Sequence, residues 1–231
     1  MKCRGLAVVV GLALSACGNE PEAPATEATP ATATPPAPQQ TPNGPERRIL
    51  AFGDSLFAGY GLEEGEGYPD VLEAALRSQG INARVIDAGV SGDTTAAGLQ
   101  RIAFVLDAQD PPPELAIIEL GGNDLLRGIA PSQTRENLIA ILTEVQKRRI
   151  PVLLMGMRSP PNLGEAYVAE FDRIYPELAE RFGTALVPFF LEPVYDKPAL
   201  IQQDRIHPTA EGIEAMVAAT ADNVAGALPK K

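Results

Sequence analysis

The chain has little of the chemistry on which many enzymes rely, since its 231 residues include no tryptophan, a single histidine and two cysteines. Both cysteines, Cys3 and Cys17, lie near the N-terminus, so the rest of the chain has no thiol from which a disulfide framework could form. The same shortage excludes a zinc site built on several His or Cys ligands, and we expect neither a metal nor a cofactor. Any chemistry must then use hydroxyl groups, carboxylates, amides and the one imidazole, that of His207.

Positive charge is also scarce, with 19 Lys and Arg against 30 Asp and Glu and a net charge of −11. A protein that binds nucleic-acid phosphates needs a basic face, so we expect no nucleic-acid partner. The apolar fraction is 45% and the charged fraction is 21%, which is typical of a packed globular domain. These values argue against a chain disordered throughout and against a polytopic membrane protein, and the length fits one domain with an additional segment.

Residues 1–16 have the features of a lipoprotein signal peptide. Two basic residues precede an apolar run, Gly5–Leu14, that is too short to span a bilayer as a helix. The sequence LSAC (14–17) resembles the lipobox of bacterial lipoproteins, which implies cleavage before Cys17 and acylation of its thiol. Because residue 18 is Gly and not Asp, the resemblance implies attachment to the outer membrane, facing the periplasm. An ordinary secretory signal that happens to contain a cysteine is the alternative.

Residues 17–46 predict a lipidated cysteine followed by a disordered tether. After Cys17 the segment consists almost wholly of Ala, Thr, Pro, Glu and Gln, with no Lys or Arg. Such a composition cannot bury enough apolar surface to offset the entropy of ordering. A proline-rich peptide ligand is the sharper alternative, but the segment has no aromatic or basic anchor. We therefore place the folded domain at residues 47–231.

Residues 47–231 alternate apolar, β-branched runs with longer segments of helical spacing. The predicted strands are 48–52, 83–87, 115–120, 151–155 and 184–187. Helical spacing marks a segment around Leu72 and Leu76 that ends at Gly80, then 99–106, 138–145 with Ser132 as its cap, 171–178, and a last helix after Pro208. This alternation predicts βαβ units and one five-stranded parallel sheet covered on both faces, a three-layer α/β/α domain.

Small and polar residues follow the predicted strands. GDS (53–55) comes after the first strand, GVSGD (89–93) after the second and GGND (121–124) after the third. DRIH (204–207) follows the fifth strand and an irregular stretch. In parallel sheets the ligand site lies at the carboxyl ends of the strands, so we expect these residues to meet at one edge.

The residue types at this edge are those of nucleophilic catalysis. Ser55 is the candidate nucleophile, and His207 is the imidazole that can remove its proton. Asp204, three residues earlier, can fold back onto one ring nitrogen and leave the other free for the serine. The backbone N–H groups of Ser55 and Gly92 and the side-chain amide of Asn123 are candidate donors to an oxyanion. Each residue alone could serve as a helix cap, a turn residue or a loop residue, and their joint presence favours catalysis.

Four segments carry a resemblance to the SGNH (GDSL-type) hydrolases, in the branch of the bacterial multifunctional thioesterase I/lysophospholipase/arylesterase. They are FGDSLFAGYG (52–61), GVSGDTTAAGLQRI (89–102), LGGNDLLRGI (120–129) and DRIHP (204–208). The resemblance covers 48–228 and implies a flavodoxin-like five-stranded sheet. It also implies a triad of Ser55, Asp204 and His207, with Gly92 and Asn123 as oxyanion donors.

The resemblance further implies a serine esterase that acts on small acyl or aryl esters, with lysophospholipids and acyl thioesters as additional lipid-like substrates. The loop 157–164, with Arg158, Ser159 and Pro160, occupies the place of a substrate-contacting loop in this branch. Relatives that favour longer acyl chains tend to carry an apolar residue where Ser159 lies. Two alternatives stay open, a carbohydrate O-deacetylase and a non-catalytic envelope-binding lipoprotein.

Overall fold

The computed structural model describes Pro42 and residues 44–230. Its single sheet has five strands, β1 (Arg47–Gly53), β2 (Ala83–Gly89), β3 (Leu115–Glu119), β4 (Val152–Met155) and β5 (Ala185–Val187). All neighbouring strands are parallel, in the order β2-β1-β3-β4-β5. This is the flavodoxin-like order, so the predicted α/β fold and its five strands are confirmed.

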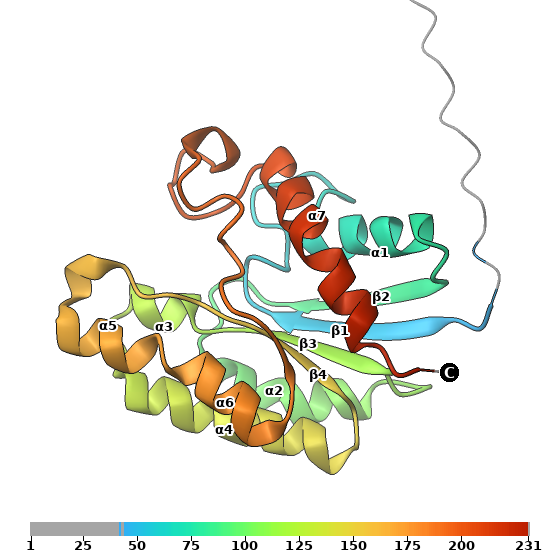
Figure 1. Ribbon diagram of the computed structural model, residues 1–231, viewed down its shortest axis with the longest axis horizontal. Helices are drawn as coiled ribbons and strands as arrows, with labels where there is room; N and C mark the ends of the chain where they lie inside the picture. Colours follow the sequence, from blue (N-terminus) through green and yellow to red (C-terminus); the bar gives the residue numbers. More distant parts are fainter. Residues whose placement is uncertain (1–41, 43, 231) are drawn as a thin grey trace, which may run out of the picture. The chain divides into compact units, whose positions relative to one another are not determined.

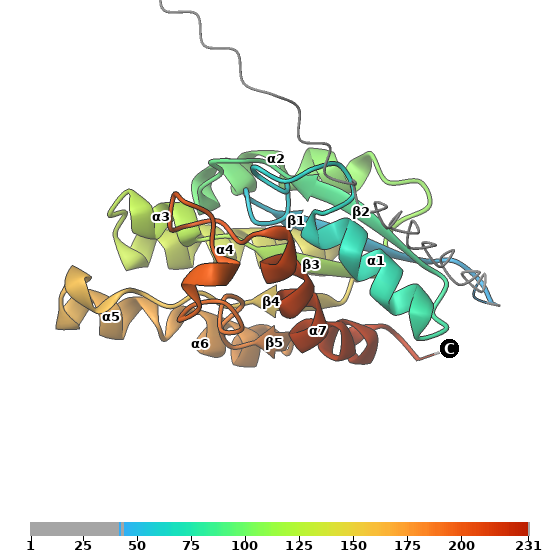
Figure 2. The same cartoon turned by 90° about the horizontal axis from the view of Figure 1, so that it is seen from above.

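Helices cover both faces of the sheet (Figures 1 and 2). On one face lie α1 (Tyr68–Ser78) and α7 (Ala210–Ala227), which pack against each other. On the other face lie α2 (Thr95–Asp107), α4 (Pro131–Lys147) and α6 (Ile174–Phe182). The shorter elements are α3 (Gly122–Leu126), α5 (Glu165–Phe171) and the 3₁₀ turns η1 (Pro161–Leu163) and η2 (Pro198–Leu200).

The core runs along the central strands. Every residue of β3 and β4 is buried, as are the last five residues of β1. A parallel strand covered on both faces needs apolar side chains at consecutive positions, which explains the unbroken apolar runs of the sequence. Glu119, the last residue of β3, departs from this rule, because it is an acidic residue with no exposed surface.

Two of the predicted helix details are wrong. Ser132 does not cap α4, because Pro131 occupies the first turn and Ala130 is the N-cap, with no side-chain hydrogen bond. Proline is favoured at the first helical position because its φ suits the helix, and this places Ser132 inside the first turn. The predicted helix at 171–178 is two helices, since α5 ends at Phe171 and α6 begins at Ile174.

The last helix begins after Pro208 as predicted, with Thr209 as its N-cap and its hydroxyl accepting the Gly212 N–H at 3.2 Å. The predicted signal peptide 1–16, Cys17 and almost all of the tether lie outside the described residues. In the part of the chain that the structure does describe, no helix is both long and apolar enough to cross a bilayer.

Candidate active site

The loop that carries Ser55 begins where β1 ends, and aromatic side chains pack against each other at its residue Phe57. The Phe57 ring stacks on Tyr68 with centroids 5.1 Å apart and meets the edge of Phe190 at 5.7 Å. A Cβ atom at Gly53 would lie 2.7 Å from the buried Phe57 ring, so only glycine fits at this point of the turn. Close packing therefore supports Ser55, which is 9% exposed.

The structure brings the three predicted triad residues together. The Ser55 hydroxyl and Nε2 of His207 are 2.9 Å apart, and Nδ1 of the same ring lies 2.6 Å from Oδ2 of Asp204. With Nδ1–H donating to Asp204, Nε2 is the acceptor for the serine proton. The arrangement is thus a hydroxyl, an imidazole and a carboxylate in hydrogen-bonded sequence.

Asp204 is held in a tight turn that also sets its charge. Its Oδ1 accepts the N–H groups of Ile206 at 2.9 Å and His207 at 3.0 Å, and Arg205, the residue that follows Asp204, has a φ of 63°. Partial burial raises the pKa of Asp204, but the hydrogen bonds from the His207 ring and from the two backbone N–H groups lower it to about 2. The carboxylate is therefore ionised at neutral pH and holds Nδ1 protonated.

The three candidate oxyanion donors lie beyond the ends of adjacent strands, Gly92 after β2, Ser55 after β1 and Asn123 after β3. Gly92 has a φ of 87°, in the left-handed region that favours glycine. Nδ2 of Asn123 donates to Oδ2 of Asp54 at 3.0 Å. An amide nitrogen carries two protons, so the second can be donated to a bound ligand.

Arg127, which sequence reasoning did not single out, links two of these positions. Its guanidinium donates to the Gly92 carbonyl at 2.6 Å, and its backbone N–H donates to the Asn123 carbonyl at 3.1 Å. The loop after β2 and the helix after β3 are thereby held together at the edge of the sheet. The signal in the sequence is an arginine three residues after the GGND segment, and its role can be interpreted only with the fold.

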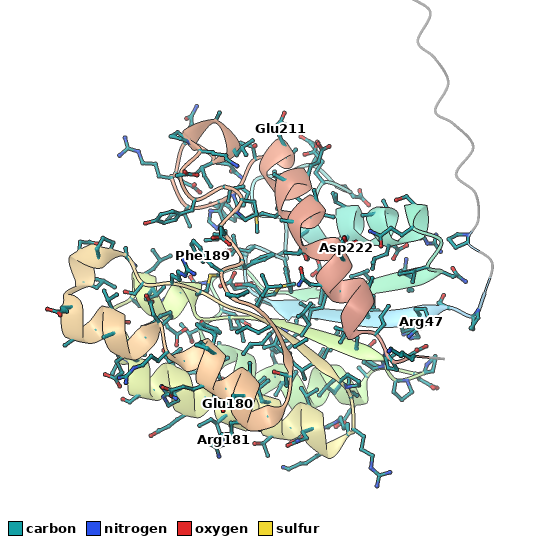
Figure 3. The ribbon with its side chains drawn as sticks, in the orientation of Figure 1. Arg47, Glu180, Arg181, Phe189, Glu211 and Asp222 are labelled. Carbon is teal, nitrogen blue, oxygen red and sulfur yellow. The ribbon has the colours of Figure 1, made fainter. Side chains whose placement is uncertain are left out.

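The predicted substrate loop follows β4 at the same edge of the sheet. Arg158 is exposed, and its guanidinium lies 5.2 Å from the ring centroid of Phe189. Phe189 follows β5 and is labelled in Figure 3. Ser159 is buried, and its N–H donates to Oδ1 of Asp172 at 2.8 Å. Pro160 is half-buried. The loop's contact with substrate stays a prediction, and at Ser159 the side chain faces the protein.

Residues 51–215 match the model of the GDSL-like Lipase/Acylhydrolase family. The chain belongs to this family. It is 42% identical to Esterase TesA of Pseudomonas aeruginosa over 160 residues, which is 69% of this chain and 79% of that protein. It is 41% identical to Thioesterase 1/protease 1/lysophospholipase L1 of Escherichia coli K12 over 163 residues, which is 71% of this chain and 76% of that protein.

Among solved structures, that of AlinE4, an SGNH-hydrolase family esterase, is similar over 81% of this chain and 100% of its own. The identity is 68% and the TM-score 0.69. The predicted SGNH (GDSL-type) family, its thioesterase I/arylesterase branch and the esterase class of hydrolase are confirmed by these similarities.

Behind Asn123, this member of the family holds two buried carboxyl groups that sequence reasoning missed. Asp54 is 1% exposed and Glu119 0% exposed, and the Asp54 N–H donates to Oε2 of Glu119 at 3.2 Å. Burial, followed by the charge of Asp54, raises the pKa of Glu119 well above its usual value of 4.5. The signal in the sequence was an acidic residue inside an otherwise apolar strand.

Asp124, the neighbour of Asn123, anchors α3 from the other side. This fully buried side chain accepts the Thr95 N–H at 2.8 Å, the Thr95 hydroxyl at 2.5 Å and the Thr134 hydroxyl at 3.0 Å. The short helix that carries Asn123 is therefore tied to both α2 and α4. Because charged hydrogen bonds are about twice as strong as neutral ones, Asp124 limits how far Asn123 can move.

Arg101 of α2 holds the ends of β1 and β2 in place. Its guanidinium donates to the Gly53 carbonyl at 2.8 Å, to the Ala88 carbonyl at 2.8 Å and to Oδ2 of Asp93 at 2.6 Å. It also lies over the Phe52 ring, 3.9 Å from the centroid. One side chain thus spans the segments that carry Ser55 and Gly92.

Among the described residues, no group of three His, Cys, Asp or Glu side chains is placed to hold a metal ion.

Proposed function

We propose that this GDSL-family chain is a serine esterase that hydrolyses small acyl or aryl esters through Ser55. The observation that carries the proposal is the pair of hydrogen bonds at His207, 2.9 Å to the Ser55 hydroxyl and 2.6 Å to Asp204. A buried serine without a base is a weak nucleophile, whereas this geometry lets the imidazole take its proton as the oxygen attacks.

In the first half of the reaction, Ser55 Oγ forms a bond to the ester carbonyl carbon while its proton passes to Nε2 of His207. The carbonyl oxygen becomes an oxyanion, which accepts hydrogen bonds from the N–H groups of Ser55 and Gly92 and from Nδ2 of Asn123. The bond to the leaving alcohol then breaks, and the alcohol takes the proton from His207. An acyl group remains on Ser55.

In the second half, a water molecule repeats the attack on the acyl-enzyme. His207 takes one water proton, the hydroxide oxygen bonds to the acyl carbon, and Ser55 leaves with the proton returned by His207. Asp204 stays ionised throughout and stabilises the imidazolium that forms in each half. The products are a carboxylic acid and an alcohol.

The substrate class is supported by the surroundings of His207. The Tyr60 ring lies with its centroid 4.4 Å from the His207 ring and is 53% exposed, so an apolar acyl or aryl group can contact it. Lysophospholipids and acyl thioesters are further proposed substrates, since a relative bears the name thioesterase and lysophospholipase.

A panel of esters tests this proposal. The purified protein would be assayed with p-nitrophenyl esters from acetate to palmitate, with acetyl-xylan and with a lysophospholipid, and Ser55→Ala would serve as the control. We expect the fastest turnover with short p-nitrophenyl esters and labelling of wild type, but not of Ser55→Ala, by a fluorophosphonate. Preference for acetyl-xylan would favour a carbohydrate deacetylase, and absence of both turnover and labelling would favour a binding protein.

We also propose that the chain is a lipoprotein held at the outer membrane, facing the periplasm, by acylation of Cys17. The support is the sequence LSAC (14–17) after an apolar run, with Gly18 following it. Several acyl chains give stable attachment where a single chain is marginal. Cys17→Ser should move the protein out of the membrane fraction or block its processing. Soluble wild-type protein from a host that processes lipoproteins would contradict the assignment.

A further inference from the structure

The oxyanion donor Asn123 rests on the buried carboxyl pair Asp54 and Glu119, and the proposed esterase mechanism gives this pair no role. The Asp54 N–H donates to Oε2 of Glu119 at 3.2 Å, so two buried acidic residues adjoin each other, and Nδ2 of Asn123 donates to Oδ2 of Asp54 at 3.0 Å. Two ionised carboxylates that share a site away from water repel each other, and neither is stabilised by solvent, so burial and the charge of Asp54 raise the pKa of Glu119 well above 4.5. One member of the pair must therefore be a neutral acid.

The hydrogen-bond donors around the pair identify which member is charged. Asp54 receives the Leu56 N–H on Oδ1 at 3.1 Å and the Asn123 amide on Oδ2 at 3.0 Å. Glu119 receives the Asp54 N–H on Oε2, while within the described residues its Oε1 has no donor at all. An unpaired carbonyl oxygen in the core is tolerable, but an unpaired carboxylate oxygen is far more costly.

Charged and titratable groups of the neighbouring elements agree with this distribution. Tyr175 of α6 donates its hydroxyl to the Leu120 carbonyl at 2.8 Å, and its burial raises its pKa well above 10, so it stays neutral. Asp124 of α3 accepts hydrogen bonds of its own from Thr95 and Thr134, and the charge of His207, when it is protonated, favours the charged form of Asp54. Negative charge on Asp54 is thus the better placed of the two.

We propose that Glu119 is a neutral acid that donates its proton to the Asp54 carboxylate, and that this charged acceptor fixes which end of the Asn123 amide faces the oxyanion. With a carboxylate 3.0 Å from Nδ2, a flipped amide would turn its oxygen toward the negative charge. Asp54 and Glu119 are then positioning residues for the proposed reaction, because they act through Asn123.

Two substitutions test the proposal, because each replaces one of the acids with the amide of the same size. Asp54→Asn puts an NH₂ group or an uncharged oxygen against the Asn123 amide, and we expect kcat to fall about 10²-fold with KM unchanged. Glu119→Gln keeps a donor to Asp54 and an acceptor for its N–H, and we expect kcat to fall by no more than about tenfold. Asp87→Asn, a carboxyl change at the end of β2, is the matched control and should keep wild-type kcat.

Infrared spectroscopy provides a second measurement that does not depend on turnover. The carbonyl stretch of a protonated carboxylic acid at neutral pH should be present in wild type and absent from Glu119→Gln. A Glu119→Gln loss as large as that of Asp54→Asn, or wild-type kcat in Asp54→Asn, would overturn the proposal. If wild type itself lacks esterase activity the proposed function fails, whereas a wild-type spectrum without the acid band contradicts the carboxyl pair alone.

Discussion

At the scale of single residues, the environment of Ser55 determines its chemistry. The hydroxyl is nearly buried, and it lies 2.9 Å from an imidazole whose other nitrogen is held by an ionised carboxylate. None of the three groups is reactive by itself near neutral pH, and the hydrogen bonds between them make the serine oxygen nucleophilic. Because the three act as one unit, removing any of them should remove most of the rate.

Ser55→Ala and His207→Ala should each lower kcat by several orders of magnitude, and the double variant should be little worse than either single variant. The reason is that a base without its nucleophile, or a nucleophile without its base, contributes almost nothing. Steady-state kinetics on p-nitrophenyl acetate, with circular dichroism to verify folding, would measure this. Losses that multiply fully in the double variant would mean that the two residues act separately.

Acidification should abolish activity by protonating the imidazole while the fold persists. Because the imidazole must be neutral to accept the serine proton, kcat/KM should rise with increasing pH and then level off. Asp204 has a pKa lowered from 3.8 to about 2, so its contribution to stability is present above pH 3.8 and lost only as the pH falls through about 2. The activity loss at pH 5 should therefore be reversible, and a flat profile between about pH 5 and 8 would exclude an imidazole base.

Asn123→Ala should lower kcat by about 10²–10³-fold and barely change KM, since an oxyanion donor acts on the transition state. Asn123→Asp should be at least as damaging, because the new carboxylate would lie beside that of Asp54, which is 3.0 Å from Nδ2 in the wild type. The ratio of kcat values at saturating ester measures the effect. A loss confined to KM would make Asn123 a ground-state binding residue.

At the scale of the secondary-structure elements, the site depends on how strand ends are held. Arg101 of α2 bonds the ends of β1 and β2 and the loop after β2, and its side chain is only 20% exposed. These strands carry Ser55 and Gly92 into the site. A long side chain on a helix can align two strand ends because its five N–H donors are arranged in a rigid plane.

Arg101→Met should lower the free energy of unfolding by about 3 kcal/mol, because it leaves the Asp93 carboxylate, 12% exposed, without its cation. The matched control is Arg135→Met, which removes a surface ion pair to Glu177, whose side chain is 48% exposed. That change should stay within about 1 kcal/mol of wild type. Urea denaturation of both variants would measure the difference, and equal losses would show that Arg101 contributes no more than a surface pair.

The strands could be predicted from the sequence because a buried parallel strand appears as an uninterrupted apolar run. The site edge could be predicted as well, since small and polar residues follow these runs. The carboxyl pair could not, because Glu119 and Asp54 are 65 residues apart and only the pairing of β1 with β3 brings them together. The break between α5 and α6 could not be predicted from the apolar spacing either. Asp172 lies at this break, and its carboxylate accepts the N–H of Ser159, 13 residues earlier in the chain.

At the scale of the whole molecule, the first strand of the described domain begins next to the C-terminal residues of the same domain. Arg47 at the beginning of β1 bonds Glu114 at 2.7 Å and the Pro229 carbonyl at 2.8 Å, at the end of the sheet opposite the site (Figure 3). The proposed tether before it contributes no apolar run from which a core could be built. The contacts of the domain thus begin at about this residue.

A chain that begins at Arg47 should therefore fold and keep wild-type kcat and KM toward soluble esters. Thermal unfolding should change little, since the described hydrogen bonds that are lost are two exposed ones, from Asn82 to the Gly44 carbonyl and from Arg48 to Glu46. Comparing kinetics and melting temperature with the full chain would test this. An unstable or inactive product would mean that residues before Arg47 pack against the fold.

The distance along the chain between Ser55 and His207 has a consequence in time. The two residues are 152 positions apart, so a ribosome makes the hydroxyl well before the imidazole. Until that final loop joins the first, the serine is an ordinary alcohol that no group deprotonates. The protein therefore cannot attack an ester until the segment that carries His207 has been made and folded, and reactivity at Ser55 reports that the two loops have met.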